Sequence, residues 1–468
     1  MRIIFFDIDC LRPDHLGCYG YDRPTSPAID SIAEQGIRFE NYFCADSPCL
    51  PSRVGMMSGR FGTNNGVVSN VGPGSGFRIK ANNYVGPRPE NEMFMRQLRR
   101  GGMNTISFSN FADRHNVWWY MCGWTEFHTP NLKGGNETAP EVTEPVMHWL
   151  KNNATRDDYF LHINYWDTHR IYKMEESWAD RFKDSPVTVP WPDDEAIEKH
   201  QSIEGPFTAQ RQFKNGKSIV PLMPDGVSNR KDFEHMITGY DASIAYVDHH
   251  VQLVLDELES QGVLEDAIII VSSDHGDAFG EHGIYSDHVN ADNCIHNIPL
   301  IIKWPGVAPE NATCDSLLYN VDVAPTLCDL LGFDIPEDWD GESFASNVKG
   351  EAGLERDYLV WGHALYTVQR GVRTKDHLMI RTYDDMGYGT DPVELFDMKN
   401  DPYQTTNVRD EQPELMWKMD HYLTEWLHEQ YSKPGTMDDP MLSVMRERNI
   451  NEYKKSDGRP RWHNTSAF

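Results

Sequence analysis

The sequence predicts an α/β protein with a large, mixed but mostly parallel sheet between two layers of helices, followed by a smaller α+β subdomain on an antiparallel sheet. Residues 3–9 and 267–271 are short apolar runs without glycine or proline, as expected for buried strands. A helical pattern over 240–261 directly precedes the second strand, and this alternation is typical of a doubly wound sheet. From residue 366, short alternating runs precede a helical pattern over 413–430, which predicts the second sheet with a helix packed on it.

These patterns divide the chain into an N-terminal catalytic domain over 1–365, a C-terminal subdomain over 366–430 and a polar tail over 431–468. Two long segments of the first domain lack any period. Residues 62–90 are rich in Gly, Asn and Pro, so we expect a loop that lines or covers the site. Residues 170–235 are charged and irregular, and we interpret them as an insertion that shapes substrate access.

Further elements follow from local signals. Residues 24–37 contain Ser26 before Pro27 and apolar residues at helical spacing, which predicts a capped helix. Strands are expected over 102–108, 159–166 and 298–302.

Composition limits the function classes. With 468 residues, 39% of them hydrophobic and 25% charged, the chain is globular. A net charge of -29 and a pI near 5.0 argue against nucleic-acid binding, which needs a basic surface. No apolar run approaches the length of a membrane span. An acidic protein that binds an anion must gather cations locally, so we expect a metal and several basic side chains in one pocket.

The compartment is predicted from two features. The first apolar run is too short for a signal peptide, and the eight cysteines lack the close spacing of a disulfide framework or a zinc site. We therefore expect a reducing cytoplasm. A homo-oligomer is compatible with the sequence.

The first strand carries two acids at its carboxyl end. Side chains alternate along a strand, so Asp7 and Asp9 point to the same face. Ligands of open α/β sheets bind at this end of the strands. A single aspartate there is more often a helix cap, but two on one face indicate a shared function.

Cys49 lies in the stretch Pro48-Cys49-Leu50-Pro51-Ser52-Arg53. The two prolines and the serine predict that its thiol sits at a helix N-terminus. Backbone N–H groups and the Arg53 guanidinium would there stabilise a thiolate, an oxyanion or a tetrahedral anion. Taken alone, the cysteine is better explained as a buried structural residue.

The stretch resembles the signature of the type I sulfatases of the alkaline phosphatase-like superfamily, in which this cysteine is oxidised to formylglycine, the catalytic aldehyde. Other stretches that resemble the family, in order, are Asp9 to Gly20, Ser273 to Asp277, Gly280 to Gly283, Asp322 to Leu327, Glu394 to Asp397 and Asn400 to Pro402. The resemblance covers residues 3 to about 425. It implies hydrolysis of a sulfate ester and maturation by a formylglycine-generating enzyme.

The resemblance also implies a divalent cation, most simply Ca²⁺ because the ligands are mainly oxygen, with Mg²⁺ or Mn²⁺ left open by a histidine. The expected ligands are Asp9, Asp274, His275 and the formylglycine at Cys49. The family has a second acid after Asp9, and this chain has Cys10 there. We expect Asp7 to supply the missing carboxylate.

Four residues are candidates for sulfate contact and proton transfer. His169 stands where the family has a histidine that contacts the sulfate and the leaving oxygen, and His288 stands where it has a sulfate-binding lysine. An ordinary histidine, with a pKa near 6.5, donates a proton at neutral pH more readily than a lysine near 10.4. Arg114 and His115 correspond to a Lys-x-His pair with a different spacing. For His288, Arg114 and His115 a plain loop role is the alternative.

The predicted function is a sulfatase acting on a small anionic substrate, a sulfated sugar or an aryl sulfate. One rival is a phosphonate monoester or phosphodiester hydrolase of the same superfamily. The other is a non-catalytic, anion-binding relative with an unmodified Cys49.

Overall fold

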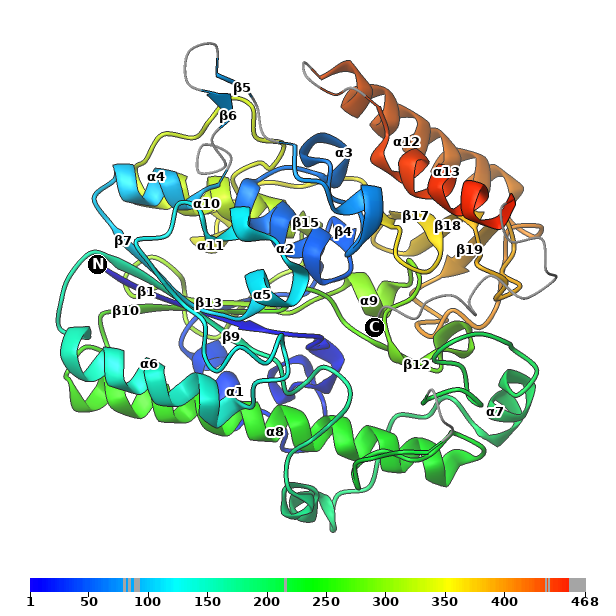
Figure 1. The fold of residues 1–468 in the computed structure, drawn as a ribbon, viewed down its shortest axis with the longest axis horizontal. Helices are drawn as coiled ribbons and strands as arrows, with labels where there is room; N and C mark the ends of the chain where they lie inside the picture. Colours follow the sequence, from blue (N-terminus) through cyan, green and yellow to red (C-terminus); the bar gives the residue numbers. More distant parts are fainter. Residues whose placement is uncertain are drawn as a thin grey trace.

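The computed structural model describes residues 1–453, except for 79–80, 83–85, 88–92, 214–216, 434–435 and 437. Its centre is an eight-stranded sheet between two layers of helices (Figure 1). In spatial order the strands are β14 (Ala312–Cys314), β2 (Ile37–Phe39), β13 (Leu300–Lys303), β10 (Ala267–Ser272), β1 (Arg2–Ile8), β9 (Tyr159–Tyr165), β7 (Asn104–Phe108) and β8 (Glu126–His128). The predicted α/β sandwich is confirmed.

The sheet is mixed because β13 runs against its neighbours. It pairs antiparallel with β10 and β2, while β1 pairs parallel with both β10 and β9. Asp7 of β1 lies in register with Ser272 of β10 and Asn164 of β9. Since these three strands end together, the residues that follow them meet at one edge of the sheet.

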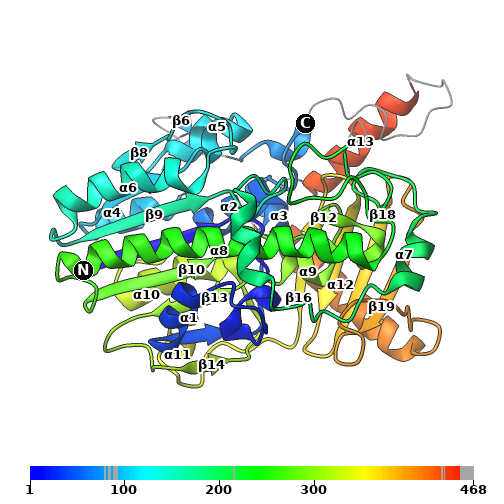
Figure 2. The ribbon, with the colours of Figure 1, turned by 90° about the horizontal axis from the view of Figure 1, so that it is seen from below.

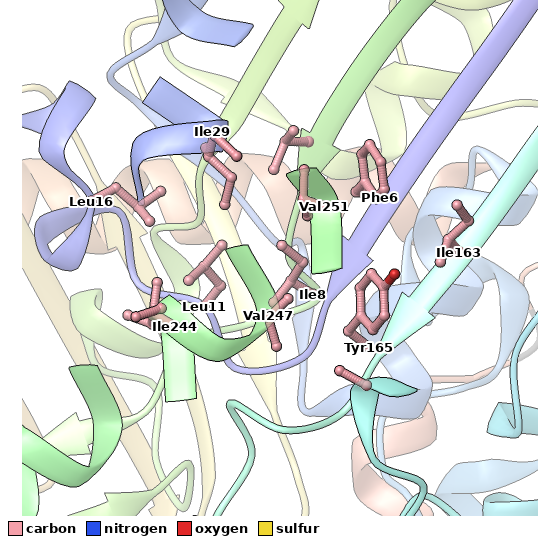
Figure 3. Close-up of a cluster of buried hydrophobic side chains, with 14 of the residues drawn as sticks. Phe6, Ile8, Leu11, Leu16, Ile29, Ile163, Tyr165, Ile244, Val247 and Val251 are labelled. Atoms are coloured by element: carbon pink, nitrogen blue, oxygen red, sulfur yellow. The ribbon is translucent and has the colours of Figure 1, made fainter. Parts of the chain in front are cut away.

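β1 is buried on both faces, which explains its continuous apolar sequence. Ile4, Phe6 and Ile8 pack into one core cluster, and Ile3 and Phe5 pack into another on the opposite face. Burial of such a side chain contributes about 1.5–3 kcal/mol. The first cluster is closed by α1 (Pro27–Glu34), α6 (Ala139–Asn153) and α8 (Arg230–Ser260). Figure 3 shows part of this cluster, including Ile29 of α1, Val247 of α8 and Ile8 of β1. The second is closed by α2 (Cys49–Ser58), α4 (Met95–Arg100), α5 (Phe111–His115), α10 (Val323–Leu331) and α11 (Ala345–Val348).

The longest helix, α8, crosses the face of the sheet that Figure 2 shows from below. It begins at Arg230, ten residues before the predicted start at 240. The side chain of Asn229 caps it by accepting a hydrogen bond from the Asp232 amide, and Phe233 and Ile237 extend its buried stripe. The last part of the predicted insertion is therefore helix. The described residues of its earlier part hold short elements, including α7 (Asp194–His200).

The second sheet has the order β19 (Val393–Asp397), β18 (His377–Asp384), β17 (Val368–Arg373), β16 (Leu359–His363) and β4 (Asp46–Ser47). β16 to β19 pair antiparallel, and α12 (Pro413–Ser432) packs on them through Met419, Leu423 and Trp426. β16 precedes residue 366, and β4 comes from the segment just before Cys49. The second sheet is therefore completed by β4, a strand of the N-terminal part of the chain that lies just before Cys49.

Shorter elements complete the fold. They are the strand pairs β3 (Tyr42–Phe43) with β15 (Leu318–Tyr319), β11 (Ala278–Phe279) with β12 (Tyr285–Asp287) and β5 (Ala81–Asn82) with β6 (Gly86–Pro87), and the helices α3 (Gly62–Asn65), α9 (Asn293–His296) and α13 (Pro440–Tyr453). Parts of the predicted loop 62–90, and residues 454–468 of the predicted tail, lie outside the described residues. Among the described residues, no helix combines the length and hydropathy that a membrane span requires.

Candidate active site

Cys49 is the first residue of α2, as the two flanking prolines predict. α2 is held against the edge of the main sheet by Ser52, whose Oγ donates to the Asp274 carbonyl at 2.5 Å and accepts from Asn320 Nδ2 at 3.0 Å. Burial raises the pKa of the Cys49 thiol, and nearby Asp9 raises it further. The expectation of a stabilised thiolate is therefore wrong. The unmodified thiol is protonated and a poor nucleophile.

Arg53, one helical turn after Cys49, is fully buried among three carboxylates. Its Nη1 lies 3.0 Å from Asp9 Oδ2 and 2.6 Å from Asp274 Oδ2, and its other nitrogens bind Asp7. Burial opposes ionisation of Asp9, but Arg53 outweighs it and lowers the Asp9 pKa. Burial raises the pKa of Asp274 to about 6, with Asp9 adding to the shift and Arg53 opposing it. Three acids facing one arginine leave an excess of negative charge, which favours a cation.

Four side chains offer ligand atoms to a metal ion. Donor atoms of Asp9, Cys49, Asp274 and His275 lie within 4.8 Å of one another, and all four residues are buried. His275 Nδ1 donates to the Gly276 carbonyl at 2.9 Å, so the lone pair is on Nε2, 3.2 Å from Cys49 Sγ. Two carboxylates and an oriented imidazole beside the cysteine fit a divalent cation.

Asp7 does not join this group. As predicted, it shares a face with Asp9, and both acids contact Arg53. However, its Oδ1 and Oδ2 accept from Arg53 Nη2 at 2.9 Å and from Nε at 2.6 Å, and His162 Nε2 lies 3.2 Å from Oδ2. This corrects the expectation that Asp7 replaces the acid missing at Cys10, because both of its oxygens already serve the guanidinium.

A cavity of about 700 Å³ opens beside Cys49. Its wall includes all four predicted contact residues, Arg114, His115, His169 and His288. Arg114 packs over the Trp166 ring and its Nη2 lies 3.3 Å from His169 Nε2. The structure thus brings one end of α5, the segment after β9 and the segment after β12 to one place.

The histidines of this wall differ in charge. Burial and then Arg114 lower the pKa of His169 to about 3, and its Nδ1 donates to the Arg170 carbonyl, so Nε2 is an acceptor. Burial also lowers the pKa of His115, whose Nε2 has no hydrogen-bond partner among the described residues. Both rings are neutral at physiological pH. His169 is therefore not a cationic proton donor.

His288 is cationic. Burial and His275 oppose its charge, but Asp287 and the hydrogen bond to Asp277 outweigh them and raise its pKa to about 10. Its Nδ1 lies 2.7 Å from Asp277 Oδ1. The argument that His288 is a readier acid than lysine fails, because two carboxylates give it a pKa close to that of an ordinary lysine.

Sequence reasoning missed several residues around the site. Asp277 orients His288, and His162 contacts Asp7. Arg170, Lys173 and Asp287 line the cavity. Arg170 lies 3.5 Å from Asp287, and its guanidinium packs over the Phe207 ring. Asp277 lies in a stretch that the sequence singled out. Lys173 carried no local signal because it lies within the irregular segment that follows His169.

Comparisons with known proteins identify the family of the chain. A family model described as Sulfatase matches residues 3–333, and one described as N-sulphoglucosamine sulphohydrolase, C-terminal, matches residues 280–433. The chain is 24% identical to an N-acetylglucosamine-6-O-sulfatase of Bacteroides thetaiotaomicron, over 87% of this chain and 82% of the relative. It is 22% identical to an arylsulfatase of Clostridium perfringens, over 87% of this chain and 90% of the relative.

Solved structures show the same fold. A protein in complex with its substrate D-glucosamine-2-N,6-O-disulfate superposes with a TM-score of 0.74 at 19% identity, covering 93% of this chain and 99% of the other. The phosphonate monoester hydrolase of Agrobacterium radiobacter gives 0.72 at 18% identity, covering 92% and 96%. These superpositions show the fold that the chain shares with a sulfated-sugar-binding protein and with a phosphonate monoester hydrolase. The chain belongs to the sulfatase family, whose model matches well over half of it, and it is a sulfuric ester hydrolase.

Proposed function

We propose that this sulfatase hydrolyses a sulfate ester of a carbohydrate, using formylglycine derived from Cys49 and a divalent cation, with Ca²⁺ as the favoured ion. The observation that carries the proposal is the position of Cys49 at the start of α2, between the acids around Arg53 and the cationic wall of the cavity. The names of two relatives, an N-acetylglucosamine-6-O-sulfatase and a Δ4,5-hexuronate-2-O-sulfatase, support a sugar as the alcohol.

The proposal assigns a position to the formylglycine and to the divalent cation. Formylglycine at position 49 would supply a hydrated aldehyde, whose two hydroxyls would serve as the nucleophile towards sulfur and as the group that allows sulfate to be released. Asp9, Asp274 and His275 would hold the cation, which supplies positive charge beside the sulfate oxygens. The carboxylate oxygens favour Ca²⁺, whereas the His275 nitrogen favours Mg²⁺ or Mn²⁺.

Side chains of the protein position the metal ligands, contact the sulfate and donate the proton. Arg53 holds Asp9 and Asp274 in place through its Nη1. Arg114 presents a fixed positive charge to the sulfate, and neutral His169 fixes the orientation of its guanidinium. His288 carries the proton that the leaving alcohol needs, while Asp277 holds the ring by its Nδ1. We assign the role of general acid to His288 because His169 is unprotonated.

Maturation and location are part of the proposal. The partner would be a formylglycine-generating enzyme that oxidises Cys49. The location would be a reducing cytoplasm, which the wide spacing of the eight cysteines in the sequence supports.

The experiment that tests the function is sulfate release from a panel of sulfated mono- and disaccharides, with an aryl sulfate and a phosphonate monoester as comparison substrates. Intact-mass measurement of the same preparation shows whether Cys49 has been converted, because oxidation to the aldehyde lowers the mass by about 18 Da. We expect a converted protein that prefers one sulfated sugar. A converted protein that cleaves the phosphonate faster than every sulfate ester would overturn the proposal.

A further inference from the structure

A second cavity, of about 570 Å³, lies between the segment around α7 and the part of the chain that forms the second sheet. α7 and β19 lie at the same end of the molecule in both views (Figure 1 and Figure 2). Among the described residues, none that lines the active-site cavity also lines this one. Ligand cavities of proteins commonly have volumes of about 300–1,000 Å³. The second cavity is therefore large enough for a small organic molecule and is distinct from the site around Cys49.

Glu394 of β19 brings an incompletely paired carboxylate to this cavity. It lines the cavity and is more than nine-tenths buried, with 8% of its surface exposed. Its Oε1 lies 3.3 Å from His282 Nε2, whereas its Oε2 is buried and has no hydrogen-bond partner among the described residues. His282 also faces Asp292, whose Oδ1 lies 2.8 Å from the histidine Nδ1. One imidazolium between two carboxylates leaves a negative charge in excess, and a buried charge favours a partner of opposite sign.

Aromatic rings and neutral polar groups surround this carboxylate. Trp191 and Phe396 line the cavity, and Trp191 stacks on the Tyr403 ring with the centroids 5.3 Å apart. Such rings offer a flat apolar surface and attract ammonium groups. Thr390 and Asn407 also line the cavity, and Thr390 Oγ1 is buried without a hydrogen-bond partner among the described residues. The wall therefore suits a ligand that combines a positive charge with hydroxyl groups.

We propose that the second cavity binds an amino sugar, whose ammonium group contacts Glu394 and whose ring packs on Trp191. The ammonium group supplies the positive charge that the carboxylate lacks, in a charge-assisted hydrogen bond. A ligand hydroxyl pairs with Thr390. A sulfate or carboxylate group would instead bring a second negative charge to Glu394 and be repelled. The inference goes beyond the proposed function and does not depend on it, because this binding needs neither Cys49 nor a metal.

Tyr388 belongs to the wall between the two cavities. It lines the second cavity, and its hydroxyl donates to the Pro206 carbonyl at 3.0 Å. It packs against a cluster that contains Tyr366, and the Phe207 and Tyr366 rings meet edge to face with centroids 5.5 Å apart. Phe207 and Tyr366 both line the active-site cavity. An amino sugar in the second cavity would therefore lie next to an aromatic wall of the active site without contacting a residue that we assign to catalysis.

The test uses the full-length Cys49→Ala protein, so that no turnover accompanies binding. D-glucosamine is titrated by calorimetry at about pH 6, below the ordinary pKa range of an amine. D-glucose, which carries a hydroxyl in place of the amine, is the matched ligand. We expect D-glucosamine to bind, and D-glucose to bind at least about 10-fold more weakly because the hydrogen bond between charged groups is lost. No binding of D-glucosamine, or equal affinity for the two sugars, would overturn the proposal.

Two further variants in the same background locate the site. Glu394→Gln should weaken D-glucosamine binding at least about 10-fold, and Trp191→Leu about 2- to 5-fold through the lost cation–π contact. Glu425→Gln is the matched control and should bind unchanged, because Glu425 pairs with His421 at 3.2 Å but lines neither cavity. If the Glu394→Gln protein does not fold, Trp191→Leu decides. Unchanged D-glucosamine binding in the folded variants of the cavity would place the ligand elsewhere and overturn the proposal.

Discussion

Arg53 and Asp7 form a buried ion pair with two contacts, Nε to Oδ2 at 2.6 Å and Nη2 to Oδ1 at 2.9 Å. These two contacts fix the orientation of the guanidinium. Its remaining nitrogen, Nη1, donates to Asp9 and to Asp274. A planar fork of donors can hold one carboxylate with two nitrogens and still reach others. Asp7 is therefore a positioning residue for the candidate metal ligands.

The first prediction concerns this pair. Asp7→Asn should destabilise the fold by about 3–5 kcal/mol, because it leaves a buried guanidinium short of one partner. Metal content should remain, since Asp7 is not a ligand. Denaturant unfolding and elemental analysis measure the two effects, and Asp9→Asn is the control that should lose metal. Equal metal loss in both variants would show that Asp7 is a metal ligand.

The second prediction concerns Cys49. Cys49→Ala and Cys49→Ser should lose turnover while circular dichroism and the melting temperature stay close to those of the unchanged protein, because the thiol is a precursor of the nucleophile. Removing one buried sulfur costs only a small packing energy. Turnover with the best sugar sulfate is the measurement. Unchanged rates in folded variants would remove Cys49 from the mechanism.

The third prediction concerns His288 and pH. Its protonated form is the useful one, so activity should fall as pH rises towards its pKa of about 10. Asp277→Asn removes a carboxylate that raises this pKa, so the alkaline limb of kcat/KM should move to lower pH. His288→Gln should lose more rate with an alkyl sulfate than with an activated aryl sulfate, because only the poor leaving group needs the proton. An unmoved limb, or equal losses on both substrates, would exclude His288 as the acid.

The raised pKa of His288 also makes the stability of the fold depend on pH. Because the folded pKa of His288 is raised from the ordinary 6.5 to about 10, its contribution to folding is complete below about 6.5 and is lost as pH rises towards 10.

The fourth prediction concerns His282, which joins the two parts of the chain. Its Nδ1 lies 2.8 Å from Asp292 Oδ1, and its Nε2 lies 3.3 Å from Glu394 Oε1 on β19. Burial opposes its charge, but the two carboxylates raise its pKa well above 6.5. His282→Gln should therefore destabilise the protein by about 3–5 kcal/mol at neutral pH. Because the charge is lost at high pH, the difference from the unchanged protein should shrink as pH rises.

Unfolding curves at neutral and alkaline pH measure this effect, with His421→Gln, an exposed pair with Glu425, as the control that should change little. A difference that stays constant with pH would show that His282 acts by packing and not by charge.

The fifth prediction concerns the metal. Treatment with a chelator should lower the melting temperature and abolish turnover, because Arg53 alone is then left to offset the buried charges of Asp9 and Asp274. Adding ion back at 100 times its Kd should restore about 2.7 kcal/mol. Ca²⁺, Mg²⁺ and Mn²⁺ are compared separately by thermal unfolding and by rate. An unchanged melting temperature after verified metal removal would contradict the assigned ligands.

The sequence by itself determined the features that local patterns encode. The apolar run of β1, the prolines around Cys49 and the acids after β1 and β10 each follow from a few neighbouring residues, because strand period, helix starts and strand ends are local properties. It therefore indicated the sandwich, the small second sheet and five of the residues that line the cavity, namely Cys49, Arg114, His115, His169 and His288.

Tertiary structure decided what depends on partners from distant segments. Arg53 binds both oxygens of Asp7, two carboxylates convert His288 into a lysine-like cation, and burial together with Arg114 keeps His169 neutral. Packing also extended α8 back to Arg230 and placed β4 in the second sheet. A pKa and an ion pair are set by burial and by charges within a few ångströms, and only the folded chain brings those charges together.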